Sequence, residues 1–363
     1  MSETALLEQV TAEILRDDAA RREPASGASS APDDAWAPAL WRTLEAAGLP
    51  LVGVPEARGG AGGGWPEIAA VLRSLGRFPA PVPLAETAAL AGWLLAEAGL
   101  PVPSGPLTVA PTRFGESIDL ELTTYGWRLH GQAARVPWAS QAGMIVVLAR
   151  RGRGHAVATV PLKACRVESG VNLAGEPRDT LTFRNVRLPA DAARSVSPGW
   201  DHLLARGALA RSVQMVGALE RVLELTVEYV QARTQFGRSL GRFQAVQHEL
   251  ARLAGETVAA AAAVDGAVRA ASRGDGAMEM AAAKVRAGEA GSTGARIAHQ
   301  LHGAIGFTHE HQLHRLTTRL WSWRDEFGAE REWAARLGRF AAGAGPASYW
   351  DWFTRDTIMR SKA

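Results

Sequence analysis

The 363-residue sequence has one cysteine, very few lysines and no long uncharged apolar run. The single cysteine, Cys165, excludes an internal disulfide framework and is typical of a reducing compartment, so we expect a cytoplasmic protein. No run of about 18 or more uncharged apolar residues is present, and no membrane span is expected. The first twenty residues lack the short apolar block and small-residue cleavage site of a signal peptide.

Arginine supplies nearly all of the basic charge, because Lys163, Lys284 and Lys362 are the only lysines. The formal net charge is only +3. No basic cluster is interleaved with aromatic residues, so we expect no nucleic-acid partner and interpret most arginines as dispersed surface residues. The length and the ordinary balance of 47% hydrophobic and 21% charged residues favour two or three packed subdomains.

The N-terminal third shows helical periodicity. Apolar residues recur at helical spacing within residues 1–22, and Gly and Pro separate three further helical segments at 36–48, 65–77 and 84–99. The Pro/Ser/Ala-rich stretch 23–34 is typical of a loop. The glycine-rich stretch 55–64 is also predicted as a loop, because no strand leads into it as a dinucleotide-binding fingerprint requires.

The middle of the chain changes to short β-rich runs. These runs are separated by turn residues at intervals that favour an antiparallel sandwich or barrel, and they lie at 107–110, 118–124, 126–136, 144–149, 155–162 and 180–188.

From Gly199 onward the sequence is helical again. Apolar residues spaced three or four apart form a stripe from Leu209 to Val230, and two further long helical stretches follow at 245–271 and 277–303. The small residues of these stretches allow close helix packing, which favours a four-helix bundle. The expected fold is mainly α with a central β domain, divided into an N-terminal helical domain (1–105), a small β-sandwich or barrel (106–192) and a C-terminal helical bundle (193–363).

Four sequence blocks carry a family resemblance. They are GLPLVGVPEARGGAG (48–62), GEPRDTLTFRNVRLPAD (175–191), RTQFGRSLGRFQAVQHELA (233–251) and QLHGAIGFTHEHQLHRL (300–316). In this order they resemble the acyl-CoA dehydrogenase family over nearly the whole chain. The resemblance implies a flavoprotein of fatty-acid or steroid side-chain catabolism that binds FAD and an acyl-CoA. It also implies a homo- or hetero-oligomer, a dimer or tetramer, that passes electrons to an electron-transfer flavoprotein-like acceptor.

In that family FAD lies between the β domain and the bundle, and a neighbouring subunit completes its adenine end. The resemblance places Arg233 at the FAD diphosphate, which a guanidinium can bind bidentately. Gln235 and Phe236 fall at positions that border the cofactor, and Gln244 falls near the adenosine. Without the surrounding motif, Arg233 is better explained as an exposed arginine at a helix end.

The resemblance supplies two further groups of cofactor contacts. Gln300 and Gly303 match the segment that approaches the pyrophosphate of the partner's FAD, and Ala304 replaces the second glycine of the usual pair. Trp138 matches a tryptophan that shields the flavin ring, and Ser140 matches a hydroxyl near N5 and O4. A tryptophan of the core beside a turn serine explains the same two residues without a flavin.

The sequence departs from the family upstream of Trp138. The family's segment for the flavin pyrimidine and the acyl-CoA falls at 109–119, where this chain has VAPTRFGESID with the order of its motif residues changed. Glu116 and Ser117 are the residues that retain part of that role.

The catalytic base is also missing. The implied reaction is α,β-dehydrogenation, in which a carboxylate removes the α-proton while hydride leaves for flavin N5, and the base must lie within hydrogen-bond reach. The commonest glutamate position falls on Phe327, followed by the expected Gly328, and the alternative position falls on Gly207. Asp325 and Glu326 adjoin the gap, and Glu326 is the candidate base if the loop is shifted by one residue.

Other chemistry-bearing residues favour ordinary structural roles. His302, His309, His311 and His314 lie close in sequence but lack carboxylates at ligand spacing, so no metal site is expected. The tryptophans of the motif WSWRDEFG, Trp321 and Trp323 in the sequence, are expected to pack beside the acyl pocket.

Three functional hypotheses remain open from the sequence. The chain is a subunit without its own base that completes a related partner, which explains the lost carboxylate, the changed pyrimidine loop and the retained bundle residues together. Alternatively, it is a self-sufficient dehydrogenase that uses Glu326. A third, more distant hypothesis is a flavin-free structural or binding subunit.

Overall fold

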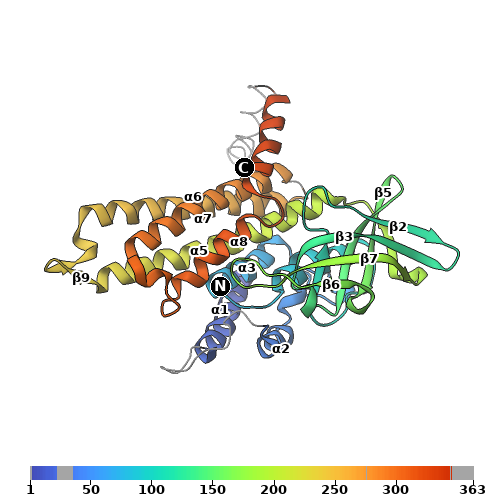
Figure 1. The fold of residues 1–363 in the computed structure, drawn as a ribbon, viewed down its shortest axis with the longest axis horizontal. Coiled ribbons are helices and arrows are strands. Elements are labelled where there is room, and N and C mark those ends of the chain that lie inside the picture. The colour runs from blue at the N-terminus through green and yellow to red at the C-terminus, as the bar shows by residue number, and fades with distance from the viewer. Residues whose placement is uncertain (1, 23–35, 275, 344, 346–363) are drawn as a thin grey trace.

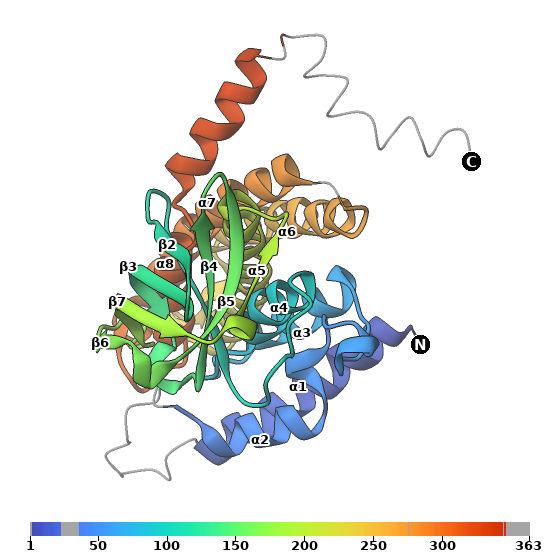
Figure 2. The same ribbon diagram turned by 90° about the vertical axis from the view of Figure 1, so that its right-hand side faces the viewer.

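The computed structural model describes residues 2–22, 36–274, 276–343 and 345. A β-sheet lies at one end of the long axis, and a bundle of long helices runs to the other end (Figure 1). The N-terminal helices pack beside the bundle helix that extends toward the sheet, as the turned view shows (Figure 2). The three-part order expected from the sequence is therefore the observed order.

The N-terminal part consists of helices that share one apolar core with the bundle and with part of the sheet. They are α1 (Glu3–Arg22), α2 (Pro38–Ala46), α3 (Trp65–Arg77), the π-helical η3 (Glu86–Ala91) and α4 (Gly92–Glu97), with 3-10 turns η1 (Leu49–Leu51) and η2 (Glu56–Arg58). All four predicted helical segments are confirmed, although the sequence pattern does not predict that 84–99 contains a π-helical turn. The predicted loop at 23–34 lies outside the described residues. The glycine-rich stretch 55–64 is a loop with one 3-10 turn, as predicted.

Reciprocal glycines dock α3 against the first bundle helix, α5 (Trp200–Ala232). A Cβ added to Gly76 would lie 2.0 Å from the Gln214 carbonyl oxygen, and one added to Gly217 would lie 2.0 Å from that of Arg73. The two helices therefore touch through their backbones, which only glycine permits at these positions. Ion pairs join the flanks of this contact, including Arg77 with Glu224 at 2.8 Å.

The central part is one mixed sheet of eight strands. Its strands are β1 (Leu107–Ala110), β2 (Ile118–Thr123), β3 (Gly126–Pro137), β4 (Met144–Arg151), β5 (Gly154–Pro161), β6 (Arg166–Glu168), β7 (Arg178–Leu188) and β8 (Ala193–Val196). The order is β6-β7-β3-β2-β4-β5-β8, with β1 paired to β4. The six predicted runs are all strands. The sequence pattern does not predict β6 and β8, because strands of three and four residues are too short to show a period. Strand β8 extends the sheet four residues past the expected boundary at residue 192.

The sheet folds into two halves around its own core. Strands β2 and β4 meet at a single residue pair, Asp119 with Arg150, so the two halves bend at this point. Their inner faces bury a second apolar cluster that includes Leu129, Phe183 and Val147. This arrangement agrees with the predicted sandwich, but the expectation of a purely antiparallel sheet is wrong. Strand β4 pairs in parallel with both β1 and β2, because β1 enters from the N-terminal part beside η3.

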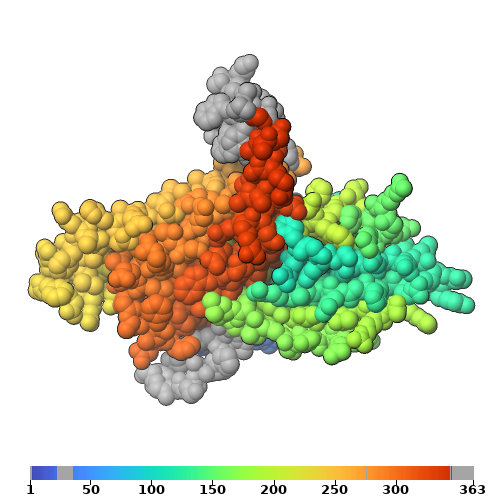
Figure 3. All heavy atoms as spheres, turned by 45° about the horizontal axis from the view of Figure 1, so that its top comes forward, coloured from blue at the N-terminus to red at the C-terminus, as the bar shows by residue number. Residues whose placement is uncertain are grey.

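The C-terminal part is the predicted four-helix bundle. Its helices are α5, α6 (Gln244–Ser272), α7 (Ala277–His302) and α8 (Leu313–Arg324), and the links contain β9 (Thr234–Gln235), β10 (Arg238–Ser239), η7 (Leu240–Arg242) and η8 (Gly303–Phe307). A further helical stretch at 330–343 leaves the body between the bundle and the sheet (Figure 3). In the described part of the chain, no helix has both the length and the apolar character that crossing a membrane requires.

Candidate active site

The two positions where the family resemblance predicts a base face each other in the structure. Phe327 follows α8, is 2% exposed and has a positive φ of 53°. A Cβ added to Gly207 on α5 would lie 2.2 Å from Cδ1 of the Phe327 ring. The two candidate base positions, which lie in distant segments of the sequence, therefore meet at one location. A phenyl ring fills the space at this location.

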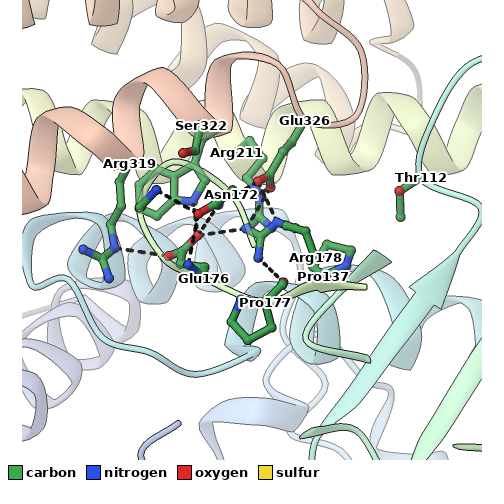
Figure 4. Close-up of polar contacts among 12 residues, drawn as sticks. Thr112, Pro137, Asn172, Glu176, Pro177, Arg178, Arg211, Arg319, Ser322 and Glu326 are labelled. Carbon is green, nitrogen blue, oxygen red and sulfur yellow. Dashed lines mark hydrogen bonds and ion pairs between the residues drawn. The ribbon is translucent and has the colours of Figure 1, made fainter. Parts of the chain in front are cut away.

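Glu326, the candidate base, is bound by two arginines beside this ring (Figure 4). Its Oε1 accepts hydrogen bonds from Nε of Arg178 at 2.7 Å and from the side-chain amide of Asn172 at 3.2 Å. Its Oε2 accepts hydrogen bonds from Nη2 of Arg178 at 3.1 Å and from Nε of Arg211 at 2.7 Å. Both carboxylate oxygens therefore have guanidinium donors.

A second buried glutamate extends the network toward α8. Glu176 accepts hydrogen bonds from Arg178 at 2.8 Å, from Arg319 at 3.1 Å and from the Trp323 indole at 3.1 Å. Asn172 connects the two acids, because its amide nitrogen contacts Glu176 at 2.9 Å and also Glu326. The loop that leads into β7 is thus fastened to the loop that carries Phe327.

The N-terminal part closes the same network. Glu86, at the start of the π-helical η3, pairs with the Arg211 guanidinium, which also donates to Gln214 at 2.7 Å. Six buried side chains form this network, and each is at most 8% exposed: Arg178, Arg211, Arg319, Glu86, Glu176 and Glu326. The three positive charges therefore balance the three negative charges of the network inside the protein. Such a network is stable only when every charge is paired.

The electrostatics of Glu326 are unsuited to proton abstraction. Burial alone would raise the pKa of this carboxyl, but Arg178 and Arg211 outweigh burial and lower the pKa to about 2. A general base works best with a pKa near the operating pH and a free lone pair aimed at the substrate. The structure therefore places Glu326 in an ion-pair network, in which guanidinium groups donate to both of its carboxylate oxygens. Asp325, its neighbour, has a half-exposed side chain near Arg324.

An open cleft of about 590 Å³ borders both Glu326 and Phe327. The sheet contributes residues of the 112–114 loop and of the end of β3, and residues 324–332 form the opposite wall. Glu116, the residue expected to retain a flavin contact, does not line this cleft. Its carboxylate accepts the Ala134 backbone N–H at 2.9 Å, and burial raises its pKa.

Trp138 and Ser140 occupy the predicted end of β3 but have partners within the chain. Trp138 has a φ of 56°, is 2% exposed and packs on Trp36 with ring centroids 6.5 Å apart. The Ser140 hydroxyl donates to Asp179 at 2.6 Å, and the same carboxylate oxygen accepts its backbone N–H at 2.8 Å. The indole is thus covered by the chain's own residues.

The remaining predicted cofactor residues gather at the opposite end of the molecule from the sheet (Figure 1). Arg233 ends α5, and the β9–β10 hairpin that follows carries Gln235 and Phe236. The whole set lies at the links α5–α6 and α7–α8 and is exposed; it consists of Arg233, Gln235, Phe236, Gln244, Gln300, Gly303 and Ala304. Phe236 is 87% exposed, and Gly303 has a φ of 66° that favours glycine.

Histidines and aromatic rings support this end of the bundle. His302 stacks on Tyr229 with ring centroids 4.5 Å apart, and His299 stacks on Phe307 at 4.0 Å. Burial lowers the pKa of both histidines, that of His302 to about 4, so both are neutral packing groups near pH 7. Across the described residues, no group of three or more His, Cys, Asp or Glu is arranged to hold a metal ion.

Glu326 is the one member of the buried network that the sequence motifs single out, and they give no indication of its arginine partners or of Glu86 and Glu176. Arg211 carries the one available signal, because it interrupts the apolar stripe of α5 between Leu209 and Val213. A charge at a predicted core position requires a buried counter-charge. The partner Glu86 gives no such signal, since its segment contains few other polar residues to set a period.

Comparisons with known proteins agree with this architecture. A sequence model described as the acyl-CoA dehydrogenase C-terminal domain matches residues 201–324. Acyl-CoA dehydrogenase IpdE2 of Mycobacterium tuberculosis is 32% identical over 292 residues, which cover 79% of this chain and 81% of that protein.

Two solved structures are similar over almost the full chain. A chain of the ChsE4–ChsE5 complex from Mycobacterium tuberculosis has a TM-score of 0.84 and 26% identity, covering 95% of this chain and 99% of that one. A chain of a Tcur3481–Tcur3483 steroid ACAD variant has a TM-score of 0.83 and 30% identity, covering 94% and 98%. The sequence match to IpdE2 and the shared fold together show that this chain belongs to the acyl-CoA dehydrogenase family of FAD-binding oxidoreductases.

Proposed function

We propose that this chain is the base-lacking subunit of a heteromeric acyl-CoA dehydrogenase and that a related partner chain supplies the catalytic carboxylate. The observation that carries the proposal is the contact between Phe327 and Gly207, which fills with a phenyl ring the space that either family glutamate would occupy. The neighbouring acid, Glu326, is held by Arg178 and Arg211. The alternative of a self-sufficient enzyme that uses Glu326 is not favoured by this geometry.

The similar structures support a partner of the same family. The ChsE4–ChsE5 complex and the Tcur3481–Tcur3483 steroid ACAD are each named for two different chains. The residues of the bundle end that are predicted to contact FAD are present and exposed in this chain, which is consistent with a role in such an assembly.

The residues at the bundle end suit the diphosphate half of FAD. Arg233 offers an exposed guanidinium, and Gln244 and Gln300 offer exposed amides, which are suitable donors for phosphate and nucleotide oxygens. A Cβ added to Gly303 would have no other atom within 4 Å, so a ligand can approach the backbone closely at this residue. Because these residues lie far from the sheet, we propose that they bind a FAD whose ring rests on the partner chain.

The ring end of this chain's own cleft is a poorer fit for the flavin. Trp138 is covered by Trp36, and the Ser140 hydroxyl proton is used by Asp179. In the assembly, FAD supplies the hydride acceptor for α,β-dehydrogenation of the acyl-CoA. The contribution of this chain is to hold the nucleotide half through Arg233 and its neighbours. The Glu326 network fastens the base loop, residues 325–329, which carries Phe327.

Co-expression tests this proposal. The chain is purified alone and together with an acyl-CoA dehydrogenase-like chain encoded beside it, and flavin absorbance and ferrocenium-coupled turnover of acyl-CoA are measured. We expect turnover only from the pair, and no loss of turnover per intact complex in Glu326→Gln. Turnover by the lone chain that disappears in Glu326→Gln would refute the proposal. A colourless pair would favour the flavin-free structural subunit instead.

A further inference from the structure

A second, larger cavity lies beside the base loop and is separate from the cleft described above. It has a volume of about 970 Å³ and is walled by Trp65, Trp93, Met278 and Trp333. Trp333 and Phe114 pack with ring centroids 5.3 Å apart, and Phe114 lines only the first cleft. The two aromatic side chains thus form a partition. A mainly apolar cavity of this size accommodates an organic ligand.

Arg206 presents a cation to this apolar cavity. Its guanidinium lies between two indole rings, 4.7 Å from the Trp65 centroid and 4.4 Å from that of Trp93. Its Nε donates to the Ala89 carbonyl at 3.2 Å. Within the described residues, no carboxylate lies within 4.0 Å of this guanidinium, in contrast to the paired arginines of the Glu326 network.

The other charged groups of the lining do not neutralise Arg206. Asp201 pairs with Arg336 at 2.9 Å, and Glu97, His202 and Arg339 are the other titratable groups among the described residues of the lining. Burial lowers the pKa of Arg206 to about 9, and the more distant Glu97 opposes this effect only in part. A partly buried cation for which the described residues supply no paired acid favours binding of an anion.

We propose that this cavity binds an amphipathic carboxylate, with its carboxylate on Arg206 and its apolar body between Trp65, Trp93 and Met278. The two Nη groups of one guanidinium match a carboxylate bidentately, whereas a phosphate dianion surrounded by apolar walls would need more donors. Trp65 and Trp93 hold the guanidinium plane in place, so little side-chain freedom is lost on binding. This inference does not depend on the proposed function.

The carboxylate has two chemical sources, a free acid or the distal carboxylate of an ω-carboxyacyl thioester. Arg206 immediately precedes Gly207, which contacts Phe327 of the base loop. The cavity therefore lies near that loop, and an ω-carboxyacyl thioester is included among the probes. Decanoate represents the free acid, and the CoA monothioester of decanedioic acid represents the second source. Their matched controls without a free carboxylate are 1-decanol and decanoyl-CoA.

The binding test uses calorimetry or tryptophan fluorescence on the full-length chain, with Arg206→Met and, as a control, Arg252→Met on the exposed face of α6. We expect at least one acid to bind at least 10-fold more tightly than its matched control, and Arg206→Met to remove that difference while Arg252→Met preserves it. Met278→Glu places a competing carboxylate in the wall without altering Arg206 and is also expected to prevent binding. Thermal melts establish that each variant is folded.

The result for each probe decides the proposal. Binding of either acid through Arg206 supports it, and the acid that binds identifies the source. Equal affinity for each acid and its control, unchanged acid binding in Arg206→Met, or no binding of either acid at millimolar concentration would overturn it.

Discussion

Replacing Glu326 by Gln separates a structural carboxylate from a catalytic one. In the wild-type chain three buried arginines face three buried glutamates, and the substitution leaves three guanidinium groups facing two carboxylates. An uncompensated buried charge of this kind costs about 3–5 kcal/mol. The free energy of unfolding is therefore expected to fall by that amount at pH 7.

The pKa of Glu326 gives an independent magnitude. Folding lowers this pKa from 4.5 to about 2. At about 1.4 kcal/mol per pKa unit, the shift corresponds to roughly 3 kcal/mol. A carboxyl whose pKa is lowered by folding stabilises the protein above its unfolded pKa, and this contribution is lost as the pH falls through the folded value. The stability difference between wild type and Glu326→Gln is thus expected to be full above pH 4.5 and to shrink toward pH 2.

Urea unfolding at several pH values measures this difference, with Glu121→Gln as the control. Glu121 pairs with Arg128 on the exposed surface, so its substitution is expected to change stability by about 0.5 kcal/mol or less. Unfolding of Glu326→Gln at the wild-type urea concentration at pH 7 would refute the structural role argued for Glu326.

Three further predictions concern other parts of the account. Gly207→Ala forces a Cβ into the Phe327 ring and is expected to lower the free energy of unfolding by about 1–3 kcal/mol. In a double-mutant cycle, Phe327→Ala should remove most of this penalty, and additive effects of the two substitutions would contradict the contact. Folding lowers the pKa of the buried Lys284 from 10.5 to about 7, so the unfolded state binds more protons between these pH values. Wild-type stability measured by urea unfolding should therefore rise from pH 7 to pH 9 relative to that of Lys284→Met. Parallel curves of stability against pH for the two proteins would refute this. In the co-purified complex, Arg233→Ala is expected to lower the ratio of flavin absorbance to protein absorbance, whereas the control Arg166→Ala on the exposed edge strand should not. The same ratio in Arg233→Ala and in the wild type would argue against a diphosphate contact of Arg233.

Much of the fold could be predicted because its periodicities are long. The 33-residue helix α5 shows its apolar stripe over many turns, and residues 65–77 form a helix with the predicted boundaries. The parallel pairing of β4 was not predictable, because strand order depends on how β1 enters from the N-terminal part. The π-helical turn at Glu86 is likewise imposed by tertiary contacts.

The candidate site was predictable by location but not by chemistry. Motif spacing indicated Gly207 and Phe327 as the two base positions, and in the structure these residues contact each other. The environment of Glu326 depends on Arg178 and Arg211, which lie 148 and 115 residues away in the sequence. No local pattern encodes such pairings, so sequence alone could not decide whether Glu326 is a free base or a buried counter-ion.

The most direct test of the central claim measures deuterium incorporation at the α-carbon of an acyl-CoA in D₂O by mass spectrometry. The assay uses the assembled pair, with Glu326→Gln in this chain or with the base carboxylate of the partner replaced by its amide. Exchange is expected to continue in Glu326→Gln and to stop when the partner's carboxylate is replaced. Exchange that survives the partner's substitution and is abolished by Glu326→Gln would contradict the central claim.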